Sequence, residues 1–155
     1  MRVMLAVSRA ILVSCLVAFS LAGVVRATDE NVPVPKEYGV YAKTDKGLTR
    51  IIPNMIYDDQ NILYVESSRP ARFLLNSVQY FILYGKHDIQ YLTLNNLKPF
   101  QITRLGVQRF MLGVDVPLEV QKKSEILYTA KPKGMFGRGY YALWINDSAW
   151  DFIIE

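Results

Sequence analysis

The stretch YYALWINDSAWDFII, at residues 140–154, is the clearest guide to the fold of this chain. Its first half is an apolar and aromatic run that stops at the turn-forming sequence NDS. In its second half Trp150, Phe152 and Ile154 are two residues apart, so an extended chain would place all three on one face, with Asp151 on the other. The stretch therefore predicts a hairpin of two half-buried strands.

Similar short runs of β-branched and aromatic residues recur upstream, separated by Gly, Pro, Asn and Ser. The predicted runs are 38–43 and 48–52 as a hairpin, then 62–66, 72–75, 78–84, 89–94, 118–121 and 126–130. Residues 100–116 fit a strand pair better than a short helix over 101–112, because apolar residues alternate there and two glycines interrupt them. About eight or nine strands and no long helix predict an all-β domain. We expect a two-sheet antiparallel sandwich, immunoglobulin-like, with a small barrel as the alternative.

The first 27 residues have the pattern of a secretory signal peptide. Two arginines precede an almost uninterrupted apolar run at 10–25, and small residues come before the predicted cleavage site between Ala27 and Thr28. Cleavage there predicts an exported protein, in the periplasm or outside the cell. Two other interpretations stay open. The protein could be a lipoprotein anchored through Cys15, although most of the apolar run follows this cysteine and a lipidation signal needs it before the cysteine. The leader could also be an uncleaved membrane anchor, although the run is short for a membrane span.

Composition narrows what the exported chain can do. Residues 28–37 would be an extended lead-in and residues 38–155 a single domain, large enough to bury its own core. The full chain has 18 basic and 14 acidic residues; three arginines and no acids lie in the leader, which leaves 15 against 14. A net charge of +1 does not favour nucleic acid as a partner. The only cysteine lies in the leader, so the domain has no disulfide.

The end of the chain resembles a known group of proteins. Tyr128, Lys131-Pro132, the run GYYAL at 139–143 and the closing WDF at 150–152 are similar to the finish of exported bacterial immunoglobulin-like sandwiches, many of unknown function. The run FILYG at 81–85 is similar to a strand in the same proteins. The resemblance implies the fold and says little about activity. Arg138 stands where the group usually has proline.

No residue pattern predicts a catalytic centre, a metal site or a cofactor. The only histidine, in the pair His87-Asp88, fits an exposed turn better than a dyad, because neighbours on an extended chain point in opposite directions. Asp58-Asp59 fits a turn better than a calcium loop, since it lacks the alternating acidic pattern. The glycine-rich loop at 134–139 opens a strand and not a helix, which argues against a phosphate site.

The exported part of the chain is unusually rich in aromatic residues, which make up 18 of its 128 residues. Either some aromatic side chains form a contact surface or the second face of their strands is also covered. We expect a non-enzymatic module that binds a protein or an envelope component. The alternative is a carbohydrate-binding or carbohydrate-active module, with Asp58 or Asp147 as polar contacts; a hydrolase based on His87 is third. The predicted ligand-binding residues are Tyr91, Arg138, Tyr140, Tyr141 and Trp144.

Overall fold

A computed structural model of the protein describes residues 31–134 and 136–155. The chain divides into a unit at Met1–Pro33 and a unit at Val34–Glu155, and the fold below is that of the second. The predicted signal peptide, its cleavage site and the possible lipidation site at Cys15 lie outside the described residues. So does Met135 in the glycine-rich loop.

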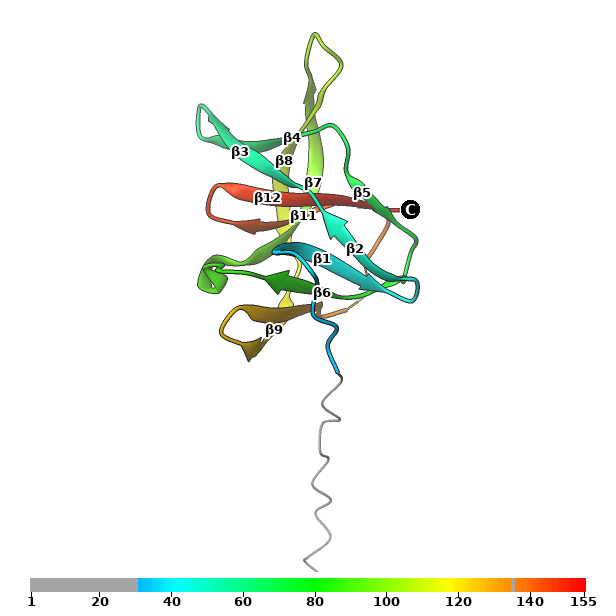
Figure 1. Ribbon diagram of the computed structural model, residues 1–155. Helices are drawn as coiled ribbons and strands as arrows, with labels where there is room; N and C mark the ends of the chain where they lie inside the picture. The colour runs from blue at the N-terminus through cyan, green and yellow to red at the C-terminus, as the bar shows by residue number, and fades with distance from the viewer. Residues whose placement is uncertain (1–30, 135) are drawn as a thin grey trace, which may run out of the picture. The chain divides into compact units, whose positions relative to one another are not determined.

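The described residues form twelve strands and one short 3-10 helix, η1 (Ile89–Tyr91) (Figure 1). Five antiparallel strands form the first sheet, in the order β2 (Gly47–Ile51), β1 (Gly39–Thr44), β6 (Val78–Tyr84), β10 (Leu127–Pro132), β9 (Leu118–Ser124). Seven strands form the second, in the order β11 (Gly139–Ile145), β7 (Thr93–Ile102), β8 (Gln108–Asp115), β4 (Ile62–Ser67), β3 (Pro53–Asp59), β12 (Ser148–Ile154), β5 (Ala71–Phe73).

The second sheet closes on itself, because β11 also pairs with β12 along its whole length, from Gly139 opposite Ile154 to Ile145 opposite Ser148. Six strands thereby form a small barrel, called the closed sheet below. The three-residue strand β5 lies outside the ring and runs parallel to β12. All other strand pairs are antiparallel.

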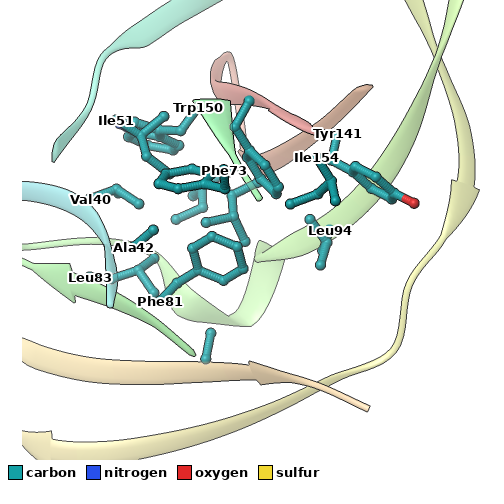
Figure 2. Close-up of a cluster of buried hydrophobic side chains, with 14 residues drawn as sticks. Val40, Ala42, Ile51, Phe73, Phe81, Leu83, Leu94, Tyr141, Trp150 and Ile154 are labelled. Carbon is teal, nitrogen blue, oxygen red and sulfur yellow. The ribbon is translucent and has the colours of Figure 1, made fainter. Parts of the chain in front are cut away.

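The hairpin β11–β12 separates two cores. Its outward face packs against the first sheet, where Phe81 and Leu83 of β6 meet Tyr141, Trp150 and other buried side chains of the hairpin (Figure 2). Its inward face fills the interior of the closed sheet, where its two alanines meet a second buried set. That second core consists of Val65, Leu97, Phe110, Ala142 and Ala149.

The all-β class with antiparallel sheets is as predicted, and so are the two hairpins at the ends of the domain. Residues 100–116 belong to the strand pair β7–β8, and the alternative of a helix over 101–112 is wrong. The closed sheet differs from the predicted sandwich of two open sheets. Because β11 pairs with both β7 and β12, neither side of β11 is a free sheet edge.

Three details of the strand prediction are wrong. The count is twelve among the described residues, not eight or nine. Residues 89–91 form η1, so the predicted strand at 89–94 begins only at Thr93. Strand β3 was not predicted, because Pro53, Asn54 and two aspartates are poor strand formers and only pairing with β4 and β12 makes them extended.

Candidate functional site

An open depression of about 350 Å³ lies at one rim of the closed sheet. It is lined by Tyr91, Thr93, Asn95, Asp115, Trp144 and Asn146. These residues come from the start of β7, the end of β8, the end of β11 and the two short segments η1 and the β11–β12 turn. Two aromatic side chains and four polar residues therefore meet at one opening.

Strand register explains why residues so far apart in the chain meet here. Trp144 of β11 lies opposite Thr93 of β7, and Asn95 of β7 lies opposite Asp115 of β8. Trp144 is two residues beyond Ala142, which belongs to the second core, so it continues the inward face of β11 to the rim. Asn146 has a positive φ of 53°, which lets the turn reverse tightly beside the indole.

Hydrogen bonds hold the polar side of the depression in place. Asn95 is only 5% exposed, and its amide donates to the Asp115 carboxylate and, at 3.5 Å, to the carbonyl of Gly113. The hydroxyl of Thr93 donates to Oδ1 of Asn95 at 2.8 Å. A donor–acceptor chain that is fixed before a ligand arrives loses little conformational entropy on binding.

The aromatic side is fixed as well. The indole Nε1–H of Trp144 donates to the backbone carbonyl of Asn146, which sets the orientation of the ring. Tyr91 is 55% exposed and is the last residue of η1, where its backbone N–H donates to the carbonyl of Asp88 at 3.1 Å. The depression thus offers one anchored ring and one more exposed ring, a common arrangement for stacking against a flat apolar face.

Gly113 is required for the local shape of β7 and β8. A Cβ atom at this position would lie 2.8 Å from both the carbonyl oxygen and Oδ1 of Asn96, closer than real contacts allow. The strand register shifts here, between Asn95 and Leu97. The missing side chain therefore permits the close approach that aims Asn95 at Asp115.

The structure brings together two of the five predicted ligand-binding residues, Tyr91 and Trp144. Tyr141 is buried in the first core, where its hydroxyl donates to the carbonyl of Gly137 at 3.1 Å. The ring of Tyr140 lies 4.3 Å from that of Phe110 inside the closed sheet. Arg138 is exposed on the connection before β11. These three are not part of the candidate site.

Sequence reasoning missed Thr93, Asn95 and Asp115. They belong to no motif, and they become neighbours only through the pairing of β7 with β8 and β11. Of the polar contacts suggested for a carbohydrate, Asp147 lies in the exposed turn next to Asn146, and Asp58 lies in the β3–β4 hairpin, where it accepts a hydrogen bond from the backbone N–H of Asn61 at 3.0 Å.

The pair Asp58-Asp59 precedes a tight turn, in agreement with the sequence. Gln60 and Asn61 both have positive φ, 52° and 68°, as the two central residues of a hairpin turn of the type that matches strand twist. Among the described residues, no three of the His, Cys, Asp and Glu side chains gather at a position that could hold a metal ion.

His87 lies in a turn, as predicted, but it is half-buried and not exposed. Its ring packs edge-on against Trp150 with the ring centroids 5.7 Å apart, and its buried Nε2 has no hydrogen-bond partner among the described residues. Burial lowers the pKa of His87 below 6.5, and a hydrogen bond to the backbone of Tyr84 opposes this only in part. The imidazole is therefore a packing group of the first core.

Acidification is expected to destabilise the protein through His87. Since the pKa is lowered in the folded state, the stabilising contribution is complete above pH 6.5 and decreases as the pH falls from 6.5 through the folded-state pKa. NMR titration of the imidazole should give a midpoint below 6.5. The variant His87→Phe, which keeps a ring beside Trp150, should lose less stability than the wild type over the same pH range. A midpoint at or above 6.5 would contradict the buried position.

Within residues 31–134 and 136–155 no helix has the length and apolar character needed to cross a membrane. Comparison of the chain with protein-family models, with curated proteins and with solved structures finds no match.

Proposed function

We propose that this protein is an exported, non-enzymatic binding module whose ligand is a saccharide of the cell envelope, held in the depression between Tyr91 and Trp144. The observation that carries the proposal is the meeting of two aromatic rings with a fixed Thr93–Asn95–Asp115 chain in one open depression. Sugar rings have apolar C–H faces and hydroxyl edges, so they are bound by aromatic stacking together with carboxylate and amide hydrogen bonds.

The charge of the lining narrows the class of ligand. Asp115 is the only ionisable carboxylate among the six lining residues, and none of the six is basic. A negatively charged ligand would meet this carboxylate with no cation to compensate it. Neutral sugars, and amino sugars that carry a positive charge, are therefore favoured over sulfated or phosphorylated ones.

A non-catalytic role is supported by the same inventory. Hydrolysis of a glycosidic bond in most enzymes requires two opposed carboxyl groups, and the lining supplies one. His87 packs against Trp150 in the first core and is not among the lining residues. The depression has the groups to hold a sugar but lacks a paired acid and base.

Binding is tested first with a glycan array and then by titrating the best ligand while following intrinsic fluorescence. Trp144→Ala is expected to weaken binding about tenfold or more, because a central aromatic anchor is lost. Asn95→Ala should weaken it as well, because Asp115 and Thr93 lose their shared partner. Tyr57→Ala is the matched control, an aromatic side chain 40% exposed on β3. A wild-type protein that retains no glycan would refute the proposal.

A protein partner is the second candidate, supported by the outer face of the closed sheet. There Tyr57 stacks on Tyr64 with ring centroids 5.4 Å apart, and the guanidinium of Arg109 lies 4.8 Å above the Tyr64 ring. Tyr57 is 40% exposed and Arg109 is partly exposed, and tyrosine and arginine are enriched at protein interfaces. In this case Tyr57→Ala would release a defined envelope protein that co-purifies with the wild type, while Trp144→Ala would retain it.

Export and the finer fold assignment belong to the same proposal. Mass spectrometry of the mature protein is expected to give a chain that starts at Thr28, and retention of Cys15 in lipidated form would contradict this. A relation to immunoglobulin-like sandwiches is supported by the packing of the first sheet on the hairpin β11–β12. The closed sheet would then be an elaboration of the second layer of such a sandwich.

A further inference from the structure

The connection between β7 and β8 carries an apolar tip that no other described segment covers. This hairpin tip, residues 102–107, protrudes beyond the neighbouring strands at the top of the view (Figure 1). Leu105 at its end is 91% exposed, and Ile102 on its flank is 65% exposed. A single exposed apolar residue is ordinary on a protein surface. Two of them at a protruding turn form a small apolar surface that can insert into a binding partner.

Backbone hydrogen bonds fix the hairpin tip in advance. The N–H of Thr103 donates to the carbonyl of Val107 at 2.9 Å, and the N–H of Gly106 donates to the carbonyl of Thr103 at 2.9 Å. The Thr103 hydroxyl accepts from the N–H of Val107 at 3.0 Å. With the turn already formed, Leu105 is held away from the domain and needs little further ordering on binding.

The part of the β7–β8 hairpin nearest the tip carries only positive charges, and the acidic Asp115 lies at the far end of β8. Residues 96–114 contain Lys98, Arg104 and Arg109 and no acidic residue. Arg109 forms an ion pair with Glu66 at 2.8 Å. Arg104 at the tip is exposed and forms no ion pair with any residue in the described part of the chain.

A further exposed arginine lies at the same end of the closed sheet. Ser67, the last residue of β4, is opposite Gln108, so Arg69 follows β4 on the side of the hairpin tip. Like Arg104, it makes no ion pair among the described residues. Two arginines that form no ion pair among the described residues thus lie at this end of the closed sheet, and one of them, Arg104, is part of the hairpin tip itself.

We propose that the hairpin tip binds an anionic lipid surface, with Leu105 and Ile102 entering the boundary of the acyl chains and Arg104 and Arg69 contacting the headgroups. A convex tip would need a matching pocket on a protein, whereas a lipid surface deforms around it. Apolar burial and attraction between basic residues and anionic headgroups then add together. This surface lies at the opposite end of β7 and β8 from Asn95 and Asp115, so the proposal is independent of the saccharide site.

The test is co-sedimentation of the purified protein with vesicles of phosphatidylcholine alone, and of phosphatidylcholine mixed with phosphatidylglycerol. The wild type is expected to bind the mixed vesicles better and to be released by salt. Leu105→Ser should weaken partitioning about tenfold, and Arg104→Glu should weaken it about fivefold or more, only on the anionic vesicles. Val114→Ser is the matched control, because Val114 is 69% exposed at the far end of β8.

The proposal would be overturned by no binding of the wild type to anionic vesicles, by equal binding to both kinds of vesicle, or by equal loss in Leu105→Ser and Val114→Ser. Binding to native membranes but not to pure lipid would assign the tip to a protein partner and would overturn it too. Circular dichroism of each variant separates loss of binding from loss of fold. Loss of saccharide binding in Trp144→Ala with vesicle binding intact would show that the two sites are separate.

Discussion

Replacing Phe152 by alanine is expected to lower the free energy of unfolding by about 3–5 kcal/mol. Phe152 of β12 is completely buried in the first core. Its ring lies 5.2 Å from that of Phe81 in the first sheet and 5.9 Å from that of Phe73 on β5, between ring centroids. Truncation leaves a cavity where two layers meet. A loss of this size is a large part of the roughly 5–15 kcal/mol that holds a domain folded.

Urea unfolding followed by circular dichroism measures this change. Phe152→Leu keeps most of the volume and should lose clearly less stability than Phe152→Ala. Phe100→Ala is the matched control, because Phe100 is 38% exposed on β7 and should cost at most about 1 kcal/mol. Equal losses at positions 100 and 152 would contradict the central place of Phe152 in the core.

Replacing Asp151 by asparagine is expected to stabilise the protein at neutral pH. Asp151 points into the closed sheet, is only 3% exposed and accepts hydrogen bonds from the Asn54 amide and the Ser67 hydroxyl. Burial raises the pKa of Asp151 above 3.8, and these hydrogen bonds offset that increase only in part. An asparagine can accept from Asn54 and donate to Ser67, so it keeps both contacts without the buried charge.

The pH dependence follows from the direction of the shift. Because the pKa is raised in the folded state, the protonated carboxyl stabilises the fold below about 3.8, and that contribution is lost as the pH rises through the folded-state pKa. The difference in unfolding free energy between Asp151→Asn and the wild type should therefore increase with pH and then level off. Each unit of pKa shift corresponds to about 1.4 kcal/mol, so the level at which this difference becomes constant measures the size of the shift.

Asp151→Ala separates the charge from its contacts. It removes the charge as well, but it leaves Asn54 and Ser67 without their partner, which costs about 1–3 kcal/mol for an unpaired buried group. The alanine variant should therefore be less stable than the asparagine variant at every pH. A wild type that is more stable than Asp151→Asn at pH 7 would contradict this prediction. It would mean that the hydrogen bonds from Asn54 and Ser67 fully offset the cost of burying the Asp151 charge.

Local sequence patterns were sufficient for the class of the fold and for its clearest hairpin. Alternation in residues 150–154 correctly put Trp150, Phe152 and Ile154 on one buried face. It also implied a solvent-exposed face for Asp151, which is wrong, because that face lies inside the closed sheet. A two-residue period identifies two faces but does not tell how many of them are covered.

The aromatic excess shows the same limit. Tyr140 and Tyr141 point to opposite faces of β11, and both faces are packed, one against Phe110 and the other in the first core. Tyr140 and Tyr141 are therefore explained by packing on both faces of β11, and not by an exposed contact surface. The candidate site could not be predicted from the sequence for a different reason. Asn95, Asp115 and Trp144 meet only through strand register, and that register depends on pairing between strands that are distant in sequence.

The position of β11 and β12 in the chain has a consequence for biosynthesis. Both strands follow every other strand of the domain, yet each core needs one of their faces. Neither core can close before the ribosome has added residues 139–154. Until then the nascent strands keep their apolar side chains open to solvent, which makes the incomplete chain prone to aggregation.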